Sequence, residues 1–369
     1  MIVRGRHPRL RQAGIGVAML APALILFGTF VAYPAVRAIW ISMHRWTGFS
    51  PRETWVGGEH FFYLFGKSAA EWFPWMLLAA GVAVAATLGG RGITHWGSDA
   101  GVRRTGRCVS IAGRVLLLGV AVGFLGVWMF AWSDGDGFFR ACVRNNFTYM
   151  ILGGAFHFVF AFLFAAALNL PGFRGKIFYR TMIFFPSFIS AVGVAMLWHR
   201  MYDPRYGILN FVLKFFRISG FEWLSGDNVL NSIIVCGVWA GVGSQMILLL
   251  AGMQRIPKTY YEAARIDGAG EGTIFTRITV PLLREVILIV VTLWVIGSLK
   301  AFGLFQAFSI GRTEKNSVIS VRQYELAFSN RDNIYQMGLA TAMAVILMVL
   351  IVVFAGLLRS LREREQVEY

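Results

Sequence analysis

The chain has 369 residues, of which 57% are hydrophobic and only 15% are charged, and its formal net charge is +16. Soluble domains carry about 25% charged residues, so this composition excludes an ordinary water-soluble protein and indicates a surface that faces lipid. The basic residues lie in short clusters between apolar runs and form no basic face on a soluble domain. We therefore expect no binding of nucleic acid.

The first predicted element is an apolar run that follows a basic N-terminus. The hydrophobic region of a signal peptide has about 7–15 residues. This run is longer, so we interpret it as a retained membrane span. Seven further runs approach the length of a bilayer-spanning helix. The predicted fold is an all-α, polytopic membrane helix bundle with about eight spans, at 14–43, 73–90, 115–132, 145–168, 182–201, 229–253, 285–306 and 336–358.

The placement of Lys and Arg predicts the orientation of the spans, because cytoplasmic loops retain basic residues. With the N-terminus inside, the inside segments hold 20 of the 35 Lys and Arg residues and the outside segments hold 12. Both termini are then cytoplasmic. The predicted inside segments are 1–13, 91–114, 169–181, 254–284 and 359–369, and the outside segments are 44–72, 133–144, 202–228 and 307–335.

The chain shows no energy source or reactive centre of its own. No predicted span has Asp or Glu in its interior, whereas ion-coupled carriers usually need such groups. Gly66-Lys67-Ser68 resembles the end of a phosphate loop, but the first glycine would fall at Phe61, so we interpret it as coincidence. The cysteines and histidines are scattered without metal-ligand spacing. We predict no catalytic residue, no metal site and no enzymatic activity.

The longest predicted cytoplasmic loop between spans, 254–284, carries the most informative pattern. Pro257 suits the start of a helix, and 261–266 contains helix formers with small residues in the middle. Three glycines then interrupt the helix. A second helix is predicted from about 273 to 279, and Pro281 opens the next turn into the membrane.

This loop resembles the cytoplasmic signature of ABC-importer permeases, which is Glu-Ala-Ala, three residues, Gly, nine residues and Ile-x-Leu-Pro. Val280 stands where leucine is usual. In that family the first short helix docks into a groove on a separate ATPase, with Glu262 holding a charged partner in the loop or on the ATPase. The residues that match, including those of the sugar-importer form, are Glu262, Ala263, Ala264, Asp267, Gly268, Ala269, Ile278 and Pro281.

The resemblance to sugar-type permeases extends beyond this loop. Tyr33-Pro34 in the first span, Asn145-Asn146-Phe147 and Gly207-Ile208-Leu209-Asn210 are examples. It implies a six-span core with two inserted spans. The implied parts are 1–65 (N-terminal cytoplasmic tail, first span and periplasmic segment), 66–139 (inserted two-span hairpin), 140–358 (core permease domain with the coupling loop 254–284) and 359–369 (cytoplasmic tail).

The resemblance is to the maltose-transporter-type first permease of the carbohydrate-uptake branch. It implies alternating access in the bacterial inner membrane, a second homologous permease, two copies of a cytoplasmic ATPase that hold ATP and Mg, an extracytoplasmic solute-binding protein and a sugar-like substrate. The residues alone leave two alternatives. One is a secondary carrier or channel that is not coupled to an ATPase, and the other is an integral-membrane enzyme.

A sugar site needs hydrogen-bonding groups and an aromatic face. Ser232, Ser244 and Trp294 fit this description, but Ser often bonds across helices and Trp often belongs to an interface belt. A cation inside a span needs a partner or a wet cavity, unless it reaches the interface. The predicted substrate contacts are Asn231, Trp239, Gln245, Ser298, Lys300 and Phe302.

Overall fold

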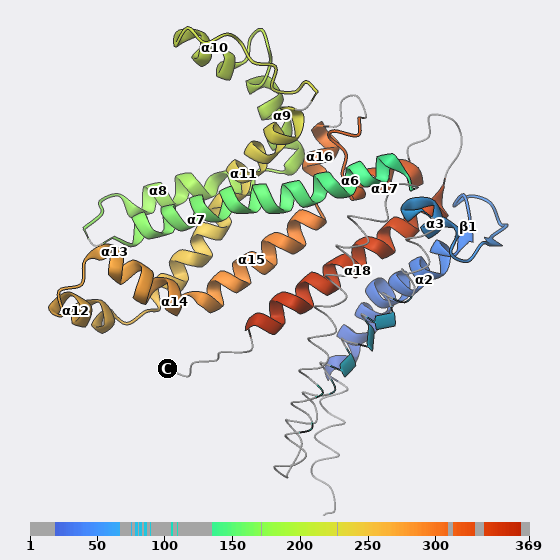
Figure 1. Cartoon of the computed structure of the whole chain (residues 1–369), viewed down its shortest axis with the longest axis horizontal. Coiled ribbons are helices and arrows are strands. Elements are labelled where there is room, and N and C mark those ends of the chain that lie inside the picture. The colour runs from blue at the N-terminus through green and yellow to red at the C-terminus, as the bar shows by residue number, and fades with distance from the viewer. Residues whose placement is uncertain are drawn as a thin grey trace, which may run out of the picture.

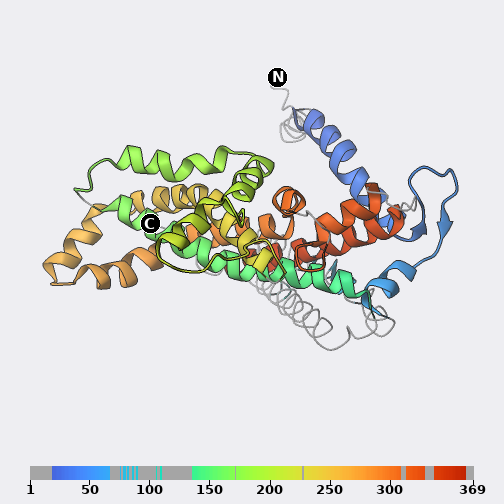
Figure 2. The same ribbon diagram turned by 90° about the horizontal axis from the view of Figure 1, so that it is seen from above.

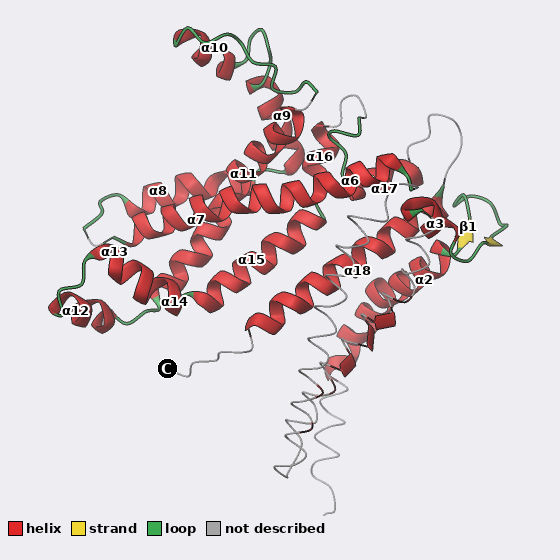
Figure 3. Ribbon diagram, viewed as in Figure 1, coloured by secondary structure: helices red, strands yellow, loops and turns green. Residues whose placement is uncertain are grey.

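The computed structural model describes residues 19–66, 135–170, 172–226, 228–308, 313–328 and 336–362, with isolated positions between 67 and 134. Within these ranges the regular structure is helical apart from a short antiparallel pairing of β1 (His44–Arg45) with β2 (Thr54–Trp55), and loops connect these elements (Figure 3). The predicted all-α fold is confirmed. Apart from those isolated positions, the predicted spans 73–90 and 115–132 lie outside the described residues.

Four helices of the described part are long and apolar enough to cross a membrane. They correspond to the predicted spans 14–43, 145–168, 229–253 and 336–358. The second has 33 residues, about 50 Å at 1.5 Å per residue, so it extends well beyond a hydrocarbon core of about 30 Å. The first, Met19–Ser42, contains η1 (Gly28–Ala32) and α2 (Tyr33–Ser42). The second, Gly137–Asn169, consists of α6 (Gly137–Thr148), η2 (Tyr149–Gly153) and α7 (Gly154–Asn169). The other two are α11 (Asn228–Gln254) and α18 (Met337–Arg362).

The predicted span 182–201 is not a single straight helix, and the prediction was wrong there. α8 (Lys176–Phe184) and η3 (Phe185–Phe188) are followed by α9 (Ala191–Met201) at an angle of 101°. The predicted span 285–306 covers α15 (Arg284–Leu299) and continues past a break at 300–302 into α16 (Gly303–Phe308). The helical stretch Glu271–Leu282 meets α15 at 68°. A proline lies in the last turn before each of these two bends, at α9 and α15, where its ring and missing N–H oppose a continued helix. If each bent pair is one span, the described part has up to six spans.

The helices form an elongated bundle whose two ends carry different loops (Figure 1). α7 packs along α11, α15 lies against α11 and α18, and α2 lies along α18. α12 (Lys258–Ile266) and α13 (Glu271–Ile274) lie at one end, and α3 (Glu59–Phe65) and β1 lie at the other, as the view from above also shows (Figure 2). α10 (Ile208–Phe215) projects from the bundle beyond α9 (Figure 1).

Small residues let the central helices approach closely. A Cβ added at Gly243 of α11 would lie 2.3 Å from the Ile183 carbonyl oxygen of α8. Trp294 of α15 fills a gap beside η2, where a Cβ added at Gly154 would lie 2.5 Å from its indole nitrogen. The same indole N–H donates to the Met150 carbonyl at 2.9 Å. Glycine thus permits the close approach of α11 to α8 and of α7 to α15, as is common between helices in membranes.

Buried asparagines tie the loops at the α3 end to the helices. Asn145 of α6 donates its amide to the carbonyls of Glu314 and Ser317, at 2.7 and 2.8 Å. Its neighbour Asn146 accepts a hydrogen bond from the Ile319 backbone N–H at 2.9 Å, at the start of α17 (Ile319–Phe328). Because buried backbone groups need partners, these amides fix a loop that has little regular structure of its own.

Candidate functional site

The segment 254–284 lies at one end of the bundle, between α11 and α15 (Figure 1). Its first helix, α12, begins directly after Pro257, whose extended backbone (φ −57°, ψ 135°) stands at the N-cap position. The start of α8 lies at the same end (Figure 1). Two segments predicted to be cytoplasmic, 169–181 and 254–284, are therefore on one side of the molecule.

α12 ends in a Schellman motif that explains the spacing of the signature. Gly268 has φ of +79°, a left-handed conformation that glycine adopts without strain. Its N–H donates to the Arg265 carbonyl at 3.1 Å, and the Ala269 N–H donates to the Ala264 carbonyl at 2.9 Å. Asp267 is the C-cap residue. These two bonds satisfy carbonyls at the end of the helix, so a glycine is required five residues after Ala263.

The outward face of α12 is exposed and carries both charge and apolar surface. Glu262 and Ala263 are exposed, whereas Ala264 is buried on the inner face. Ile266 is 86% exposed, an unusual position for an isoleucine at the end of a helix. Glu262 makes no ion pair within the described part of the chain. This face therefore combines an acidic side chain, unpaired among the described residues, with one exposed apolar side chain.

The second half of the segment is anchored in the helix bundle. It comprises α13, η4 (Phe275–Thr279) and α14 (Val280–Leu282), and it starts earlier and ends later than the predicted helix at 273–279. Ile274 is buried, and the Phe275 ring meets Phe162 of α7 edge to face at 5.3 Å. Ile278 is half-buried and Pro281 is exposed. Movement of this half must displace the helices against which it packs.

Two polar contacts link the exposed half to the anchored half. Arg265 donates two hydrogen bonds to the Glu271 carboxylate, at 3.0 and 3.1 Å. The side chains of Tyr261 and Thr279 are joined by a hydrogen bond of 3.4 Å. α12 is consequently attached to the bundle through a glycine cap, one ion pair and one hydroxyl contact.

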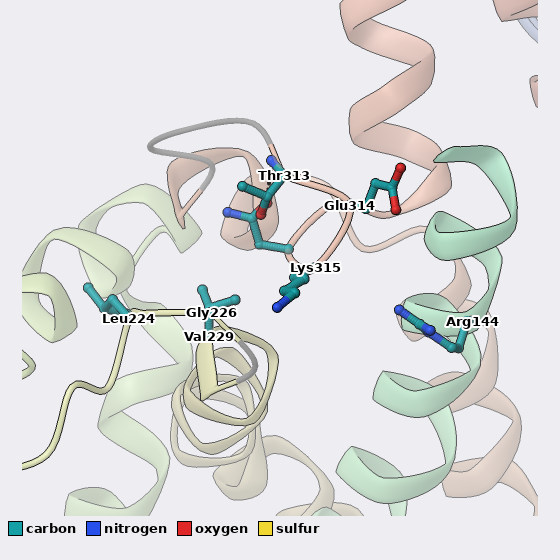
Figure 4. Close-up of a pocket in the computed structure, with 8 residues that line it drawn as sticks. Arg144, Leu224, Gly226, Val229, Thr313, Glu314 and Lys315 are labelled. Atoms are coloured by element: carbon teal, nitrogen blue, oxygen red, sulfur yellow. Dashed lines mark hydrogen bonds between the residues drawn. The ribbon is translucent and has the colours of Figure 1, made fainter. Parts of the chain in front are cut away.

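At the other end of the bundle, three segments predicted to be extracytoplasmic, 133–144, 202–228 and 307–335, come together. They enclose a cavity of about 410 Å³ (Figure 4). Its lining mixes two cations and one carboxylate with polar and apolar side chains. The lining residues are Arg144, Leu224, Gly226, Val229, Thr313, Glu314, Lys315 and Asn316.

A second cavity, of about 350 Å³, includes one of the predicted substrate contacts, Phe302. Phe302, Tyr324 and Phe328 form a series of ring contacts, each 5.4 Å between centroids. Gln323 and Ser320 supply polar groups, and the Ser320 hydroxyl is buried without a hydrogen-bond partner among the described residues. Aromatic faces beside such groups suit a sugar, whose rings have apolar faces and polar edges.

The other predicted substrate contacts line neither of these cavities. Asn231 is exposed on α11, and Lys300 is an exposed C-cap of α15. Trp239 packs on Trp198, 5.7 Å between ring centroids. Gln245 and Ser298 are buried, and the Ser298 hydroxyl donates to the Val295 carbonyl at 3.0 Å. The three weaker candidates are also engaged locally, since Ser232, Ser244 and Trp294 donate to the carbonyls of Trp223, Gly241 and Met150.

The sequence analysis did not select Ser320 or Gln323, because it assigned 307–335 to an extracytoplasmic loop. The structure places α17 in this loop. The sequence of this loop nevertheless contained a sign of a helix with an aromatic face. Tyr324 and Phe328 are four residues apart, a spacing that puts two side chains on one face of a helix.

Residues 157–366, more than half of the chain, match the protein family described as "Binding-protein-dependent transport system inner membrane component". The diacetylchitobiose uptake system permease protein NgcF of Streptomyces coelicolor is 28% identical over 365 residues, 96% of this chain and 85% of that protein. The probable ABC transporter permease protein YesP of Bacillus subtilis is 32% identical over 221 residues, 59% and 70% of the two chains.

A solved structure has the same fold. It is one chain of a bacterial ABC transporter involved in the import of the acidic polysaccharide alginate, and the TM-score is 0.65 at 22% identity. The superposition covers 96% of this chain and 98% of that one. The likeness therefore concerns the whole architecture and not a single segment.

Proposed function

This chain belongs to the family of inner membrane components of binding-protein-dependent transport systems, and we propose that it forms half of the pathway of an importer for a sugar or short oligosaccharide. It is a multi-pass ABC permease subunit and not itself an enzyme. The sugar class rests on the relatives, whose names refer to diacetylchitobiose, arabinooligosaccharides and trehalose or maltose. The aromatic cavity beside Phe302 supports it.

The observation that carries the proposal is the construction of the segment 254–284. α12 presents an exposed face with Glu262 and Ile266, and α13 and η4 are embedded in the bundle. We assign the exposed face to a groove on a cytoplasmic ATPase, with Ala263 permitting close approach and Glu262 meeting a cation there. ATP and Mg belong to the two ATPase copies, and the termini of this chain lie on the same side.

The proposed cycle is alternating access. ATP closes the ATPase dimer and displaces α12. The displacement passes through the Gly268 cap and the Arg265–Glu271 pair to the anchored half. From there the Phe275–Phe162 contact carries it to α7. The pathway between this chain and a second, homologous permease then opens outward and receives a sugar from an extracytoplasmic solute-binding protein.

The coupling role is tested by substituting α12 and its cap in the assembled importer. Glu262→Lys reverses the charge of the docking face. Gly268→Pro removes the donor to Arg265 and imposes a φ near −65° where the chain has +79°. Both variants are expected to abolish uptake of the transported sugar by cells while the protein remains in the membrane. Gly270→Ala is the matched control, because its Cβ meets open space and its φ is not positive.

Normal uptake by both the Glu262→Lys and Gly268→Pro variants would overturn the coupling assignment. A separate measurement addresses the carrier or channel alternative. Uptake is followed in membrane vesicles that contain the whole importer, with ATP or with only an ion gradient. We expect ATP to be required, and uptake driven by the gradient alone would favour the carrier.

A further inference from the structure

We propose that the 350 Å³ cavity between α17, the start of α18 and Phe302 binds one uncharged sugar ring, and that this site prefers neutral sugars to acidic ones. This inference rests on the proposed function, which supplies the sugar. It adds a charge selectivity that none of the coupling residues implies. Because α17 belongs to the segment 307–335, which is predicted to be extracytoplasmic, we place the site at the outer end of the pathway.

The spacing of side chains along two packed helices forms the cavity. α17 packs against α18, and each helix contributes residues that are three, four or seven positions apart, which lie on one side of a helix. Ala327 and Ala340 are small and leave room between the helices that a longer side chain would fill. The residues of these two faces are Ser320, Gln323, Tyr324 and Ala327 of α17 and Met337, Ala340 and Thr341 of α18.

Three aromatic rings form an apolar wall of the cavity. Phe302, Tyr324 and Phe328 contact one another in series, and all three rings are exposed. Tyr324, in the middle of the series, is 41% exposed, so its ring is accessible to the apolar face of a sugar. Aromatic belts at a membrane interface also expose rings. The polar groups beside these rings decide between lipid and sugar.

Three polar side chains beside the rings have hydrogen-bonding capacity to spare. The Ser320 hydroxyl is buried, and no described residue bonds to it. Neither the Gln323 amide nor the Tyr324 hydroxyl forms a hydrogen bond with a described residue. The Thr341 hydroxyl, in contrast, donates to carbonyls of its own helix. Buried polar groups normally have partners, and the hydroxyls of a sugar can supply them, whereas the acyl chain of a lipid cannot.

The described residues that line the cavity include no charged side chain. The nearby charges of α17 belong to a different contact, with α6. The Arg322 guanidinium lies over the Phe138 ring, 4.4 Å from its centroid, and 3.8 Å from the buried Glu325 carboxylate. A carboxylate that entered the cavity would lose water without gaining a cation, which is costly. The lining therefore favours an uncharged ring.

The test is direct binding of sugars to the full chain within its assembled importer, in nanodiscs of phosphatidylcholine and without added solute-binding protein. Saturation-transfer-difference NMR detects weak binding in fast exchange. The neutral probes are the methyl glycosides of glucose, xylose and N-acetylglucosamine, and the acidic probe is the methyl glycoside of glucuronate. We expect at least one neutral probe to bind, and the acidic probe to bind at least about tenfold more weakly than that one.

Substitutions then locate the bound ring. Tyr324→Ala removes the stacking face and should weaken binding of the neutral probe about fivefold, whereas Tyr324→Phe keeps the ring and should bind more tightly than Tyr324→Ala. Ala340→Leu fills the space between α17 and α18 and should abolish binding. If Ala340→Leu does not fold, Gln323→Leu takes its place and should weaken binding about threefold through the loss of a hydrogen bond. Tyr206→Ala, at a ring that is exposed beside α10, is the matched control and should bind normally.

The proposal is overturned if no neutral probe binds, if the acidic probe binds as tightly, or if the Tyr324→Ala and cavity variants bind like the unsubstituted protein. Binding requires no ATP. A failure here therefore leaves ATP-driven uptake and the α12 experiments unaffected, and normal uptake by the α12 variants leaves the binding measurement unchanged.

Discussion

The two ends of the bundle hold their loops by different means. At the α12 end a short helix stands out from the bundle, attached by a glycine cap, one exposed ion pair and one hydroxyl contact. At the other end, Asn145 and Asn146 reach from α6 into the 314–319 loop and are themselves buried. One end has an exposed and lightly attached element, and the other has a rim fixed by amides in the interior.

This difference fits the roles that we propose for the two ends. A docking element has to move as the ATPase opens and closes, so its attachments are few and lie near water. A rim that receives solute has to keep its shape, so its loop bonds are shielded from water, where they are costly to break. Substitutions at the fixed rim should therefore change stability, and substitutions at the docking end should change transport.

The largest expected effect comes from breaking the fixed rim at Asn146. Asn146→Leu keeps the volume but removes the acceptor of the Ile319 N–H and the donor to the Ser298 carbonyl. The Ser298 carbonyl keeps the Ala301 N–H, whereas the buried Ile319 N–H is left without a partner, so we expect a loss of about 1–3 kcal/mol in the free energy of unfolding. Unfolding by SDS in mixed micelles measures it. Asn231→Leu on the exposed face of α11 is the control, and equal stability of both variants would contradict the comparison.

Sequence reasoning predicted the docking end better than the rim, for a physical reason. The cap at Gly268 is local, since the bonds that require it span at most five residues and leave a fixed spacing in the sequence. The bonds of Asn145 and Asn146 to the 314–319 loop span about 170 residues. No local pattern reports such a contact, although Asn145-Asn146-Phe147 belongs to the resemblance noted in the sequence.

The same argument explains which spans were predicted correctly. Apolar length locates a helix but is insensitive to its direction, so the bend after Pro186 was missed, whereas the turn at Pro281 was predicted from the loop pattern. The cavities were missed because they join segments far apart in the chain, such as Phe302 with Tyr324 and Arg144 with Lys315. Of the six predicted substrate contacts, Phe302 alone lines one of the two cavities described above.

An intermediate effect is expected where the docking end enters the bundle. Phe275→Ala removes the edge-to-face contact with Phe162, and such ring pairs are worth about 0.5–1.5 kcal/mol beyond the area that they bury. We expect uptake per ATP hydrolysed to fall several-fold, since α12 still docks but its movement reaches α7 less effectively. Parallel assays of uptake and ATP hydrolysis in proteoliposomes give this ratio. Phe160→Ala, on an exposed face of α7, should leave it unchanged, and an unchanged ratio for Phe275→Ala would exclude this route.

The smallest expected effect is at the Arg265–Glu271 pair, although it links the two halves of the segment. Both side chains are largely in water, at 45% and 69% exposure, and exposed ion pairs contribute about 0.2–1 kcal/mol. Arg265→Gln should therefore slow uptake by less than about fivefold, and 0.5 M salt should reduce the difference from the unsubstituted protein because it screens the pair. Exchanging the charges, Arg265→Glu with Glu271→Arg, should restore most of the rate. If Arg265→Gln abolished uptake as Gly268→Pro is expected to, the ion pair rather than the glycine cap would be the main connection, and the docking end would be more firmly attached than its exposure indicates.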